Sequence, residues 1–232
     1  MYRPSKIEID RAAIAHNVKE IKRRIPQQLM AVVKANAYGH GAVEVATIAL
    51  ENGATMLGVA LLEEAIELRE AGIDAPILVM EAQFPEYAGV AAKHDVILSV
   101  FSAEWFEEAK AHLGERPLTV HVKVDTGMGR LGLRTREELD ALLEVADDRF
   151  VIEGIYTHFA TADEPDSALY HEQQVRFDRL MDGLGSRFKY IHTSNSAGAI
   201  RMAGEDVPYN LVRVGIAIYG LYPSSEMASF YS

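Results

Sequence analysis

Short apolar runs alternate with helical patterns along the whole chain, and this alternation limits the possible folds more than any other feature of the sequence. The apolar runs are rich in β-branched residues and short, which is typical of buried strands. We expect eight strands, at Leu29–Ala35, Met56–Ala60, Ala75–Met80, Asp95–Val100, Leu118–Asp125, Phe150–Phe159, Tyr190–Asn195 and Leu211–Gly220. Amphipathic helices are expected between them, at Arg11–Arg24, Gly41–Asn52, Leu62–Ala71, Ala103–His112, Thr135–Ala146 and Ala168–Leu184.

Strands that alternate with helices form parallel sheets, because each parallel connection needs a crossover. Eight such units in 232 residues predict a (β/α)₈ barrel of the TIM type, with residues 1–232 as one domain. A doubly wound open sheet is the alternative. The segment Leu221–Ser232 is polar and shows no helical pattern, whereas a barrel closes with a helix after its eighth strand. We therefore expect either a fragment of a longer chain or a frayed tail.

Composition excludes several classes of protein. The chain has no cysteine, which excludes disulfides, thiolate zinc sites and a cysteine nucleophile. Its 34 acidic and 23 basic residues give a net charge of −11, which argues against nucleic acid or an anionic membrane as a partner. The N-terminus has no apolar signal core, and no apolar stretch is long enough to cross a bilayer. The expected compartment is the cytoplasm.

Polar residues lie where the predicted strands end, which is where barrels carry their functional groups. Alternate strand residues point into the lumen, and Arg213 alternates with β-branched neighbours, so it faces the lumen. A buried arginine needs an acceptor, either in a structural ion pair or in a ligand. The same alternation turns His121, Lys123 and Asp125 inward. Lys123 then either pairs with a carboxylate such as Asp125 or belongs to the site.

Three further groups follow strand ends. Lys34 ends an apolar strand beside Tyr38 and His40, and such a lysine can provide the neutral amine that Schiff-base chemistry needs. His158 ends the sixth strand, either as a core histidine or as a site residue. Ser196 follows the seventh strand, where it can cap a helix whose free N–H groups also suit a phosphate.

A strand-end lysine, a lumen arginine and a phosphate pocket together indicate a phosphorylated aldehyde that is held by a Schiff base. Pyridoxal 5′-phosphate fits this description, and the sugar phosphate of a Schiff-base aldolase fits nearly as well. The eight histidines show no metal-ligand spacing, and the sequence has no P-loop or dinucleotide-binding fingerprint. We therefore expect an organic cofactor or substrate and no metal.

Five segments resemble the motifs of bacterial alanine racemases. In chain order they are Ala31–Gly41, Lys123–Gly132, Tyr156–Asp163, Asn195–Ala197 and Val212–Gly220. Their order and their spread over nearly the whole chain make the resemblance specific. It implies a pyridoxal-phosphate-binding barrel of an isomerase that interconverts L- and D-alanine and supplies D-alanine for peptidoglycan.

The resemblance implies that Lys34 carries the cofactor and serves as one catalytic base. The groups that would hold the phosphate are Tyr38, Ser196 and the backbone N–H groups of Gly215 and Ile216. Met80 would lie beside the cofactor ring, where members of the family often have leucine.

On the other side of the cofactor, the resemblance places Arg213 against the pyridine nitrogen, with His158 supporting it and Asn195 helping to position it. Arg130 would approach the phenolic oxygen of the cofactor and contact the substrate. Lys123, which is carbamylated in many members of the family, would orient Arg130. The implied catalytic residues are Lys34, Arg130, His158 and Arg213.

Members of the family carry a second, mostly β domain that supplies a tyrosine as the opposite-face base across a homodimer interface. The resemblance therefore implies that this chain binds cofactor but racemises alanine poorly or not at all by itself. Two alternatives stay open: a stand-alone pyridoxal-phosphate-binding barrel that carries the cofactor or maintains its level, and a related barrel enzyme such as a decarboxylase or a serine racemase.

Overall fold

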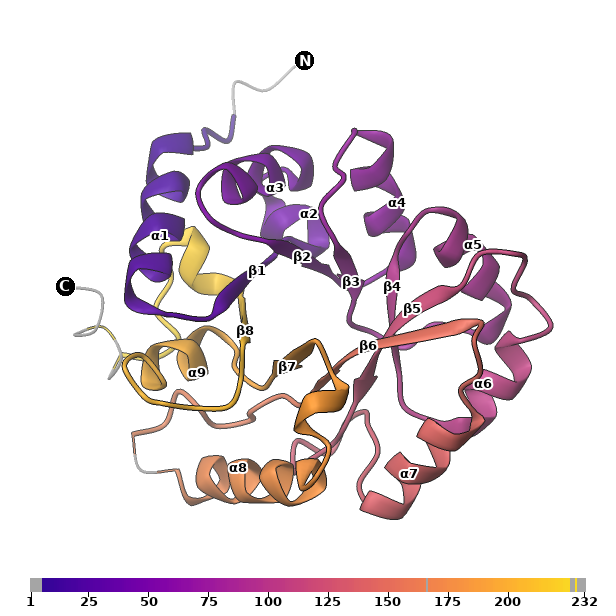
Figure 1. The fold of residues 1–232 in the computed structure, drawn as a ribbon. Helices are drawn as coiled ribbons and strands as arrows, with labels where there is room; N and C mark the ends of the chain where they lie inside the picture. The colour runs from indigo at the N-terminus through magenta and orange to yellow at the C-terminus, as the bar shows by residue number, and fades with distance from the viewer. Residues whose placement is uncertain (1–5, 166, 226–227, 229–232) are drawn as a thin grey trace.

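The computed structural model describes residues 6–165, 167–225 and 228, and within them eight parallel strands lie side by side in the order β7-β6-β5-β4-β3-β2-β1-β8 (Figure 1). The strands are β1 (Gln28–Val32), β2 (Met56–Val59), β3 (Ile77–Val79), β4 (Ile97–Val100), β5 (Leu118–Lys123), β6 (Phe150–Tyr156), β7 (Tyr190–His192) and β8 (Leu211–Val214). The predicted (β/α)₈ barrel is confirmed, and the open doubly wound sheet is wrong.

The barrel closes between its last two strands. The Asn210 N–H donates to the Ile191 carbonyl and the Arg213 N–H donates to the Ser194 carbonyl, both at 3.1 Å. On its other side β8 pairs with β1, beginning at Gln28 and Leu211. Because all eight strands are parallel, their carboxyl ends meet at one end of the barrel, where side chains from distant parts of the chain come together.

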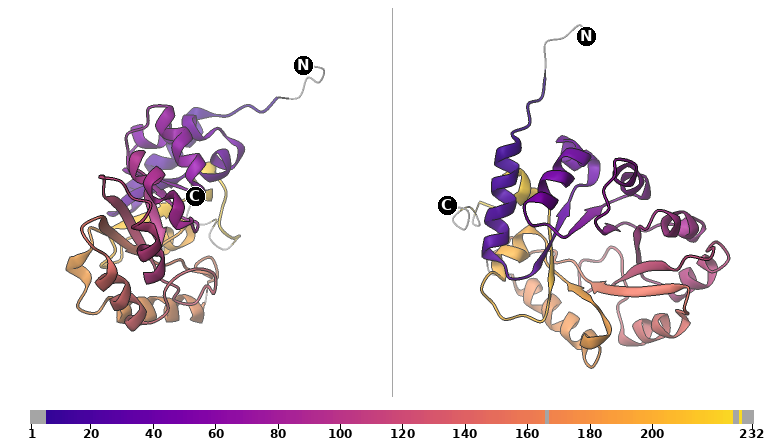
Figure 2. Two further views of the ribbon diagram at one scale, coloured as in Figure 1. Left: turned by 90° about the vertical axis from the view of Figure 1, so that its right-hand side faces the viewer. Right: turned by 45° about the horizontal axis from the view of Figure 1, so that its top comes forward.

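Helices surround the strands on the outside (Figure 2). They are α1 (Arg11–Arg24), α2 (Lys34–Gly39), α3 (Ala42–Glu51), α4 (Leu62–Glu70), α5 (Ala88–Lys93), α6 (Ala103–Ala109), α7 (Arg136–Val145), α8 (Ala168–Met181) and α9 (Ser196–Arg201), with short 3₁₀ helices η1 (Pro85–Tyr87), η2 (Gly185–Arg187) and η3 (Ile216–Tyr219). Local capping explains where several begin. The Asp10 carboxylate accepts the Ala13 N–H before α1, and Thr135 and Glu138 form a reciprocal capping box at α7. Over the described part of the chain, no helix combines the length and the apolar character that a membrane span requires.

The alternation of strand residues separates the apolar core into two layers. On β1, Leu29 and Ala31 pack outward with the helices, whereas Met30 lies in the lumen. On β8, Val212 and Val214 pack outward as predicted. The apolar cluster that fills the lumen consists of Met30, Met56, Leu78, Ile97, Tyr156, Tyr190 and Leu211. The lumen is therefore a packed core below the carboxyl ends of the strands, and not an open channel.

The predicted strands are too long at their carboxyl ends. The prediction Leu211–Gly220 is wrong beyond Val214, because the chain leaves the ladder at Gly215 and η3 follows. Strand alternation ends there too, so Ala217 and Ile218 both pack into the outer core. The polar segments that follow the shortened strands form the loops of the candidate site.

Two short helices, α2 and α5, were not predicted from the sequence, and α9 was expected only as the helix that Ser196 would cap. Each has only six residues, too few for the spacing of apolar positions to reveal a helix. Half of the expected frayed or incomplete tail, Leu221–Ser232, lies outside the described residues, which include 221–225 and 228 of it.

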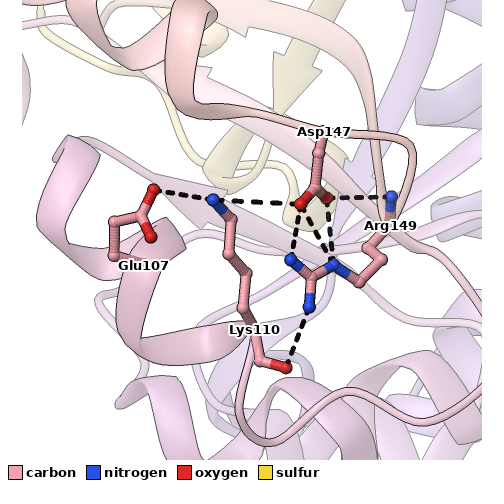
Figure 3. A network of polar contacts seen from close by, with 4 residues as sticks. All are labelled: Glu107, Lys110, Asp147 and Arg149. Carbon is pink, nitrogen blue, oxygen red and sulfur yellow. Dashed lines mark hydrogen bonds and ion pairs between the residues drawn. The ribbon is translucent and has the colours of Figure 1, made fainter.

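A cluster of ion pairs lies on the outside of the barrel, between α6 and the start of β6 (Figure 3). The Asp147 carboxylate accepts two hydrogen bonds from the Arg149 guanidinium and lies 3.8 Å from the Lys110 ammonium, which also pairs with Glu107. The Arg149 guanidinium donates in addition to the Lys110 carbonyl. These contacts join the end of α6 to the turn before β6.

Candidate active site

A cavity of about 330 Å³ lies at the carboxyl ends of the strands, a size near the lower end of the range for small-molecule sites. All site residues predicted from the sequence line it: Lys34, Tyr38, Met80, Lys123, Arg130, His158, Asn195, Ser196, Arg213, Gly215 and Ile216. Its wall also contains residues that were not predicted as site residues: Val32, Glu81, Leu131, Tyr156, Asp163, Ala197 and Pro223.

A left-handed turn follows β1 and brings both Lys34 and Tyr38 to the cavity. The four residues from Ala35 to Tyr38 all have φ near +52°, which costs about 1–2 kcal/mol per residue for side chains other than glycine. Two side chains hold the turn: the Glu64 carboxylate accepts the Ala35 N–H at 2.6 Å, and the Asn36 amide oxygen accepts the Ala42 N–H at 2.8 Å. Backbone strain of this kind persists where surrounding contacts enforce it, and it concentrates at functional sites.

Tyr38 stands against aromatic neighbours at the mouth of the cavity. Its ring centroid is 5.1 Å from that of Tyr219, whose hydroxyl donates to the Val32 carbonyl at 3.0 Å. Burial raises the pKa of the Tyr38 hydroxyl, so the group is a neutral donor at neutral pH. A β-carbon at Gly215 would lie 2.9 Å from the Tyr38 hydroxyl oxygen. The absence of a side chain at Gly215 therefore leaves the backbone of the β8–η3 turn close to this hydroxyl.

Asn195, and not Ser196, caps α9. The Asn195 side-chain oxygen accepts the Gly198 N–H at 2.9 Å, and its amide nitrogen donates to the Phe159 carbonyl at 3.2 Å. The Ser196 hydroxyl instead accepts the Gly215 N–H at 3.1 Å. The predicted N-cap role of Ser196 is wrong because its side chain turns toward β8, and this contact links the two loops that were expected to hold a phosphate.

Arg213 projects into the lumen and is 3% exposed. Its guanidinium donates to the His192 Nδ1 at 2.8 Å, to the carbonyls of Thr157 and Thr193 at 2.8 and 3.0 Å, and to the His158 Nδ1 at 3.3 Å. Burial lowers the pKa of Arg213 to about 10, which leaves it charged at neutral pH. No carboxylate of a described residue lies within ion-pair distance of it, so the alternative of a structural ion pair is wrong and neutral acceptors take its place.

The histidines beside Arg213 are neutral. An arginine only donates hydrogen bonds, so each imidazole nitrogen that faces it must be an unprotonated acceptor. Burial, and next the Arg213 charge, lower the pKa of His158 to about 2 and that of His192 well below its usual value. The positive charge on this wall of the cavity is therefore carried by the Arg213 guanidinium, and not by His158 or His192.

Lys123 is buried without a carboxylate partner among the described residues. Its ammonium nitrogen lies 4.7 Å from the centre of the Tyr156 ring and 3.3 Å from the Val124 carbonyl. Burial, and next the Arg213 charge, lower the pKa of Lys123 well below its usual value. The alternative in which Lys123 pairs with Asp125 is wrong, because the Asp125 carboxylate accepts the Gly127 and Gly129 N–H groups of the glycine loop instead. That loop carries Arg130, which is exposed at the edge of the cavity.

Comparison with known proteins identifies the family. A model described as "Alanine racemase, N-terminal domain" matches residues 9–223. The chain belongs to this family. It is 48% identical to an alanine racemase of Geobacillus kaustophilus over 97% of this chain and 60% of that relative. It superposes on a crystal structure of alanine racemase from Bacillus anthracis with bound L-Ala-P at a TM-score of 0.93 and 45% identity, covering 99% of this chain and 61% of that one.

One structurally similar protein has a different name. A histidine racemase from Leuconostoc mesenteroides has a TM-score of 0.90 and 34% identity, over 97% of this chain and 62% of that one. This chain spans about 60% of the length of the curated relatives that it matches.

Several residues that organise the site were missed by sequence reasoning. His192 and Thr157 hold Arg213, and Tyr219 holds the turn that carries Tyr38. Alternation would have found His192, because it has the same parity as Tyr190 in a short apolar strand. No comparable signal exists for Thr157, which acts through its backbone carbonyl.

Proposed function

We propose that this chain is the pyridoxal 5′-phosphate-binding barrel of an alanine racemase, an isomerase that interconverts L- and D-alanine. The observation that carries the proposal is the meeting, in one cavity, of the strand-end Lys34 and the charged, buried Arg213. Membership of the family, at 48% identity to an alanine racemase, supports the same activity. The chain itself would form one barrel domain over residues 1–232.

The residues present suit pyridoxal phosphate. The Tyr38 hydroxyl, the Ser196 hydroxyl and the backbone of Gly215 and Ile216 would hold its phosphate. A β-carbon at Gly215 would lie 2.9 Å from the Tyr38 oxygen, so glycine at this position keeps the wall between them free of a side chain. Met80 would lie against the ring, and Asn195 would keep its loop in place by capping α9.

When bound, the cofactor would supply the electron sink for removing the α-proton of alanine. The Lys34 amine would take or return this proton on one face of the α-carbon. Arg213 keeps its charge and only donates, so a pyridine nitrogen that faces it stays an unprotonated acceptor. This weakens the sink and makes proton transfer depend on well-placed bases. His158 assists by accepting from Arg213.

Lys123 and Arg130 would act together on the opposite side of the cavity. Burial makes the Lys123 amine easier to deprotonate. The deprotonated amine would add carbon dioxide and release a proton, and the carbamate would give Arg130 an anionic partner. Arg130 would then contact the phenolic oxygen of the cofactor and the substrate. The lack of a carboxylate beside Lys123 among the described residues supports this proposal.

A base on the opposite face is needed for racemisation. We propose that it is a tyrosine supplied by a β domain outside this chain, across a cytoplasmic homodimer, and that the whole protein makes D-alanine for peptidoglycan. The share of its relatives that the chain covers, about 60%, is consistent with this arrangement. The chain alone would then racemise alanine poorly or not at all.

Covalent labelling tests the cofactor site. The chain is mixed with pyridoxal phosphate and reduced with borohydride, and the modified residue is mapped by mass spectrometry. We expect the label on Lys34, and its loss in Lys34→Ala but not in Lys93→Ala, a control at an exposed lysine of α5. Label that is spread over surface lysines would contradict the proposal.

A second candidate is racemisation of another amino acid, which the similarity to a histidine racemase favours. The experiment is to measure exchange of the α-proton with solvent deuterium by a protein that includes the downstream sequence, with alanine, serine and histidine as substrates. We expect exchange to be fastest with alanine. Cofactor binding without exchange of any amino acid would instead indicate the stand-alone cofactor-binding alternative.

A further inference from the structure

A series of imidazole rings leads from Arg213 into the barrel, away from the cavity. The Arg213 guanidinium donates to the Nδ1 of His192, on β7, at 2.8 Å. The Nε2 of His192 lies 3.0 Å from the Nδ1 of His121, on β5. The Nε2 of His121 then faces the Glu153 carboxylate of β6 at 3.8 Å. Both histidines are fully buried.

Arg213 determines which ring nitrogen carries the proton in each of the two histidines. Because Arg213 only donates, the Nδ1 of His192 is an acceptor and its Nε2 carries the proton. That proton is donated to the Nδ1 of His121, so the proton of His121 lies on Nε2, toward the Glu153 carboxylate. The series thus runs from a buried cation to an anion, with each N–H pointing away from Arg213.

The barrel makes room for this arrangement. The register of β5 against β6 shifts between Val120 and His121, and a β-carbon at Gly154 would lie 2.8 Å from the His121 ring. The His192 ring is stacked on the Tyr156 ring, with centroids 4.6 Å apart and planes at 3°. A bulge, a glycine and a stacked aromatic ring therefore hold both imidazoles in fixed planes.

The far end of the series reaches the surface. Glu153 is partly exposed, and its carboxylate accepts a hydrogen bond from the exposed Lys189 at 2.7 Å. The Nε2 of His121 has no hydrogen-bond partner among the described residues, and Glu153 is the carboxylate that faces it. A buried N–H without a hydrogen-bond partner is costly. The negative charge of the nearby Glu153 carboxylate reduces this cost by attracting the N–H of His121.

We propose that His121 and Glu153 are positioning residues for Arg213, an inference that rests on the proposed function. They keep the proton of His192 on Nε2, so that Nδ1 stays free to accept from the guanidinium. With the proton on Nδ1, two donors would face each other at 2.8 Å, and Arg213 would have to turn away from its contact. His121 and Glu153, which lie away from the cavity, would thereby set the orientation of the Arg213 guanidinium toward the cofactor.

Ring-nitrogen NMR tests the series in the cofactor-free chain. At pH 7 we expect neutral His121 and His192, each with its proton on Nε2. In Glu153→Gln, the ring ¹⁵N signals of both histidines should shift, whereas Glu144→Gln, an exposed control on α7, should leave them unchanged. A proton on Nδ1 of either ring, or a shift that is confined to His121, would overturn the proposal.

Cofactor binding supplies the second readout. We expect His121→Phe to weaken the affinity for pyridoxal phosphate by about tenfold, the order of one charge-assisted hydrogen bond. Glu153→Gln, which changes a partly exposed side chain, should weaken it by less. Neither variant should change the affinity for an analogue with carbon in place of the pyridine nitrogen, because that analogue has no acceptor for Arg213.

Equal loss of affinity for both compounds would indicate a merely structural role and overturn the proposal, as would no loss for either. If the unaltered chain binds neither compound, the proposed function fails, and the NMR spectra still decide whether His121 and Glu153 set the proton of His192.

Discussion

Two groups of charged residues in this barrel obey opposite rules. The surface cluster around Asp147 pairs each cation with a carboxylate, as between Arg149 and Asp147 at 2.5 Å (Figure 3). Arg213 is almost completely buried, and among the described residues it is held by carbonyls and neutral imidazoles. Ion pairs in water contribute little to stability, because solvent screens them and both side chains lose freedom. A cation without a counter-ion in the interior is costly, so its retention indicates a use for the charge.

The surface cluster therefore depends on complementary charges, whereas the site depends on the geometry of the groups around its charge. In the surface cluster, charge complementarity is sufficient, and neighbouring segments provide it. Around Arg213 the geometry of five acceptors, on β7 and in the segments that follow β6 and β7, keeps a charge in place, and this geometry requires the closed barrel.

The largest expected effect comes from replacing the buried Arg213, compared with replacing Arg149 on the surface. Arg213→Ala leaves a cavity and several buried acceptors without a donor, so we expect the free energy of unfolding to fall by about 3 kcal/mol or more. Arg149→Ala, the surface control, should cause a much smaller change, because water replaces its hydrogen bonds. Urea unfolding of the cofactor-free chain measures both. Similar losses for the two variants would contradict the distinction.

A smaller effect is expected where the barrel makes room for the buried histidines. Gly154→Ala places a β-carbon 2.8 Å from the His121 ring, and such overpacking typically costs about 1–3 kcal/mol. Gly114→Ala is the matched control, since a β-carbon there would meet nothing within 4 Å. The unfolding midpoints of the two variants in urea give the comparison. An unchanged midpoint for Gly154→Ala would show that the His121 ring can move aside.

The smallest expected effect is on how the stability contributed by the surface cluster depends on pH. The hydrogen bonds from Arg149 lower the pKa of Asp147 from 3.8 to about 2. A lowered pKa in the folded state stabilises the fold above the unfolded-state pKa, and this contribution is lost as the pH falls from about 4 to about 2. Asp147→Asn should therefore remove part of the acid dependence of the urea midpoint in this range. A difference between variant and unaltered chain that does not vary with pH would contradict this assignment.

Much of the site could be predicted from the sequence because its residues follow strands of known parity. Arg213 and Lys123 were placed in the lumen by alternation alone, and both lie there. Their partners could not be predicted in the same way. The expected carboxylate partner of Lys123 is absent among the described residues, and Asn195 takes the capping role that was expected of Ser196. Hydrogen-bond partners depend on how loops from different strands meet, and local sequence carries little information about that.

By itself, the sequence determined the alternation of eight strands and helices and the inward direction of Arg213. These follow from the two-residue period of a strand and the parallel order of the units. Only the tertiary structure decided the left-handed turn from Ala35 to Tyr38 and the contact between His121 and His192, which lie 71 residues apart. Both depend on packing between segments that are distant in the chain, because such packing can enforce a strained backbone and can fix the protons of buried rings.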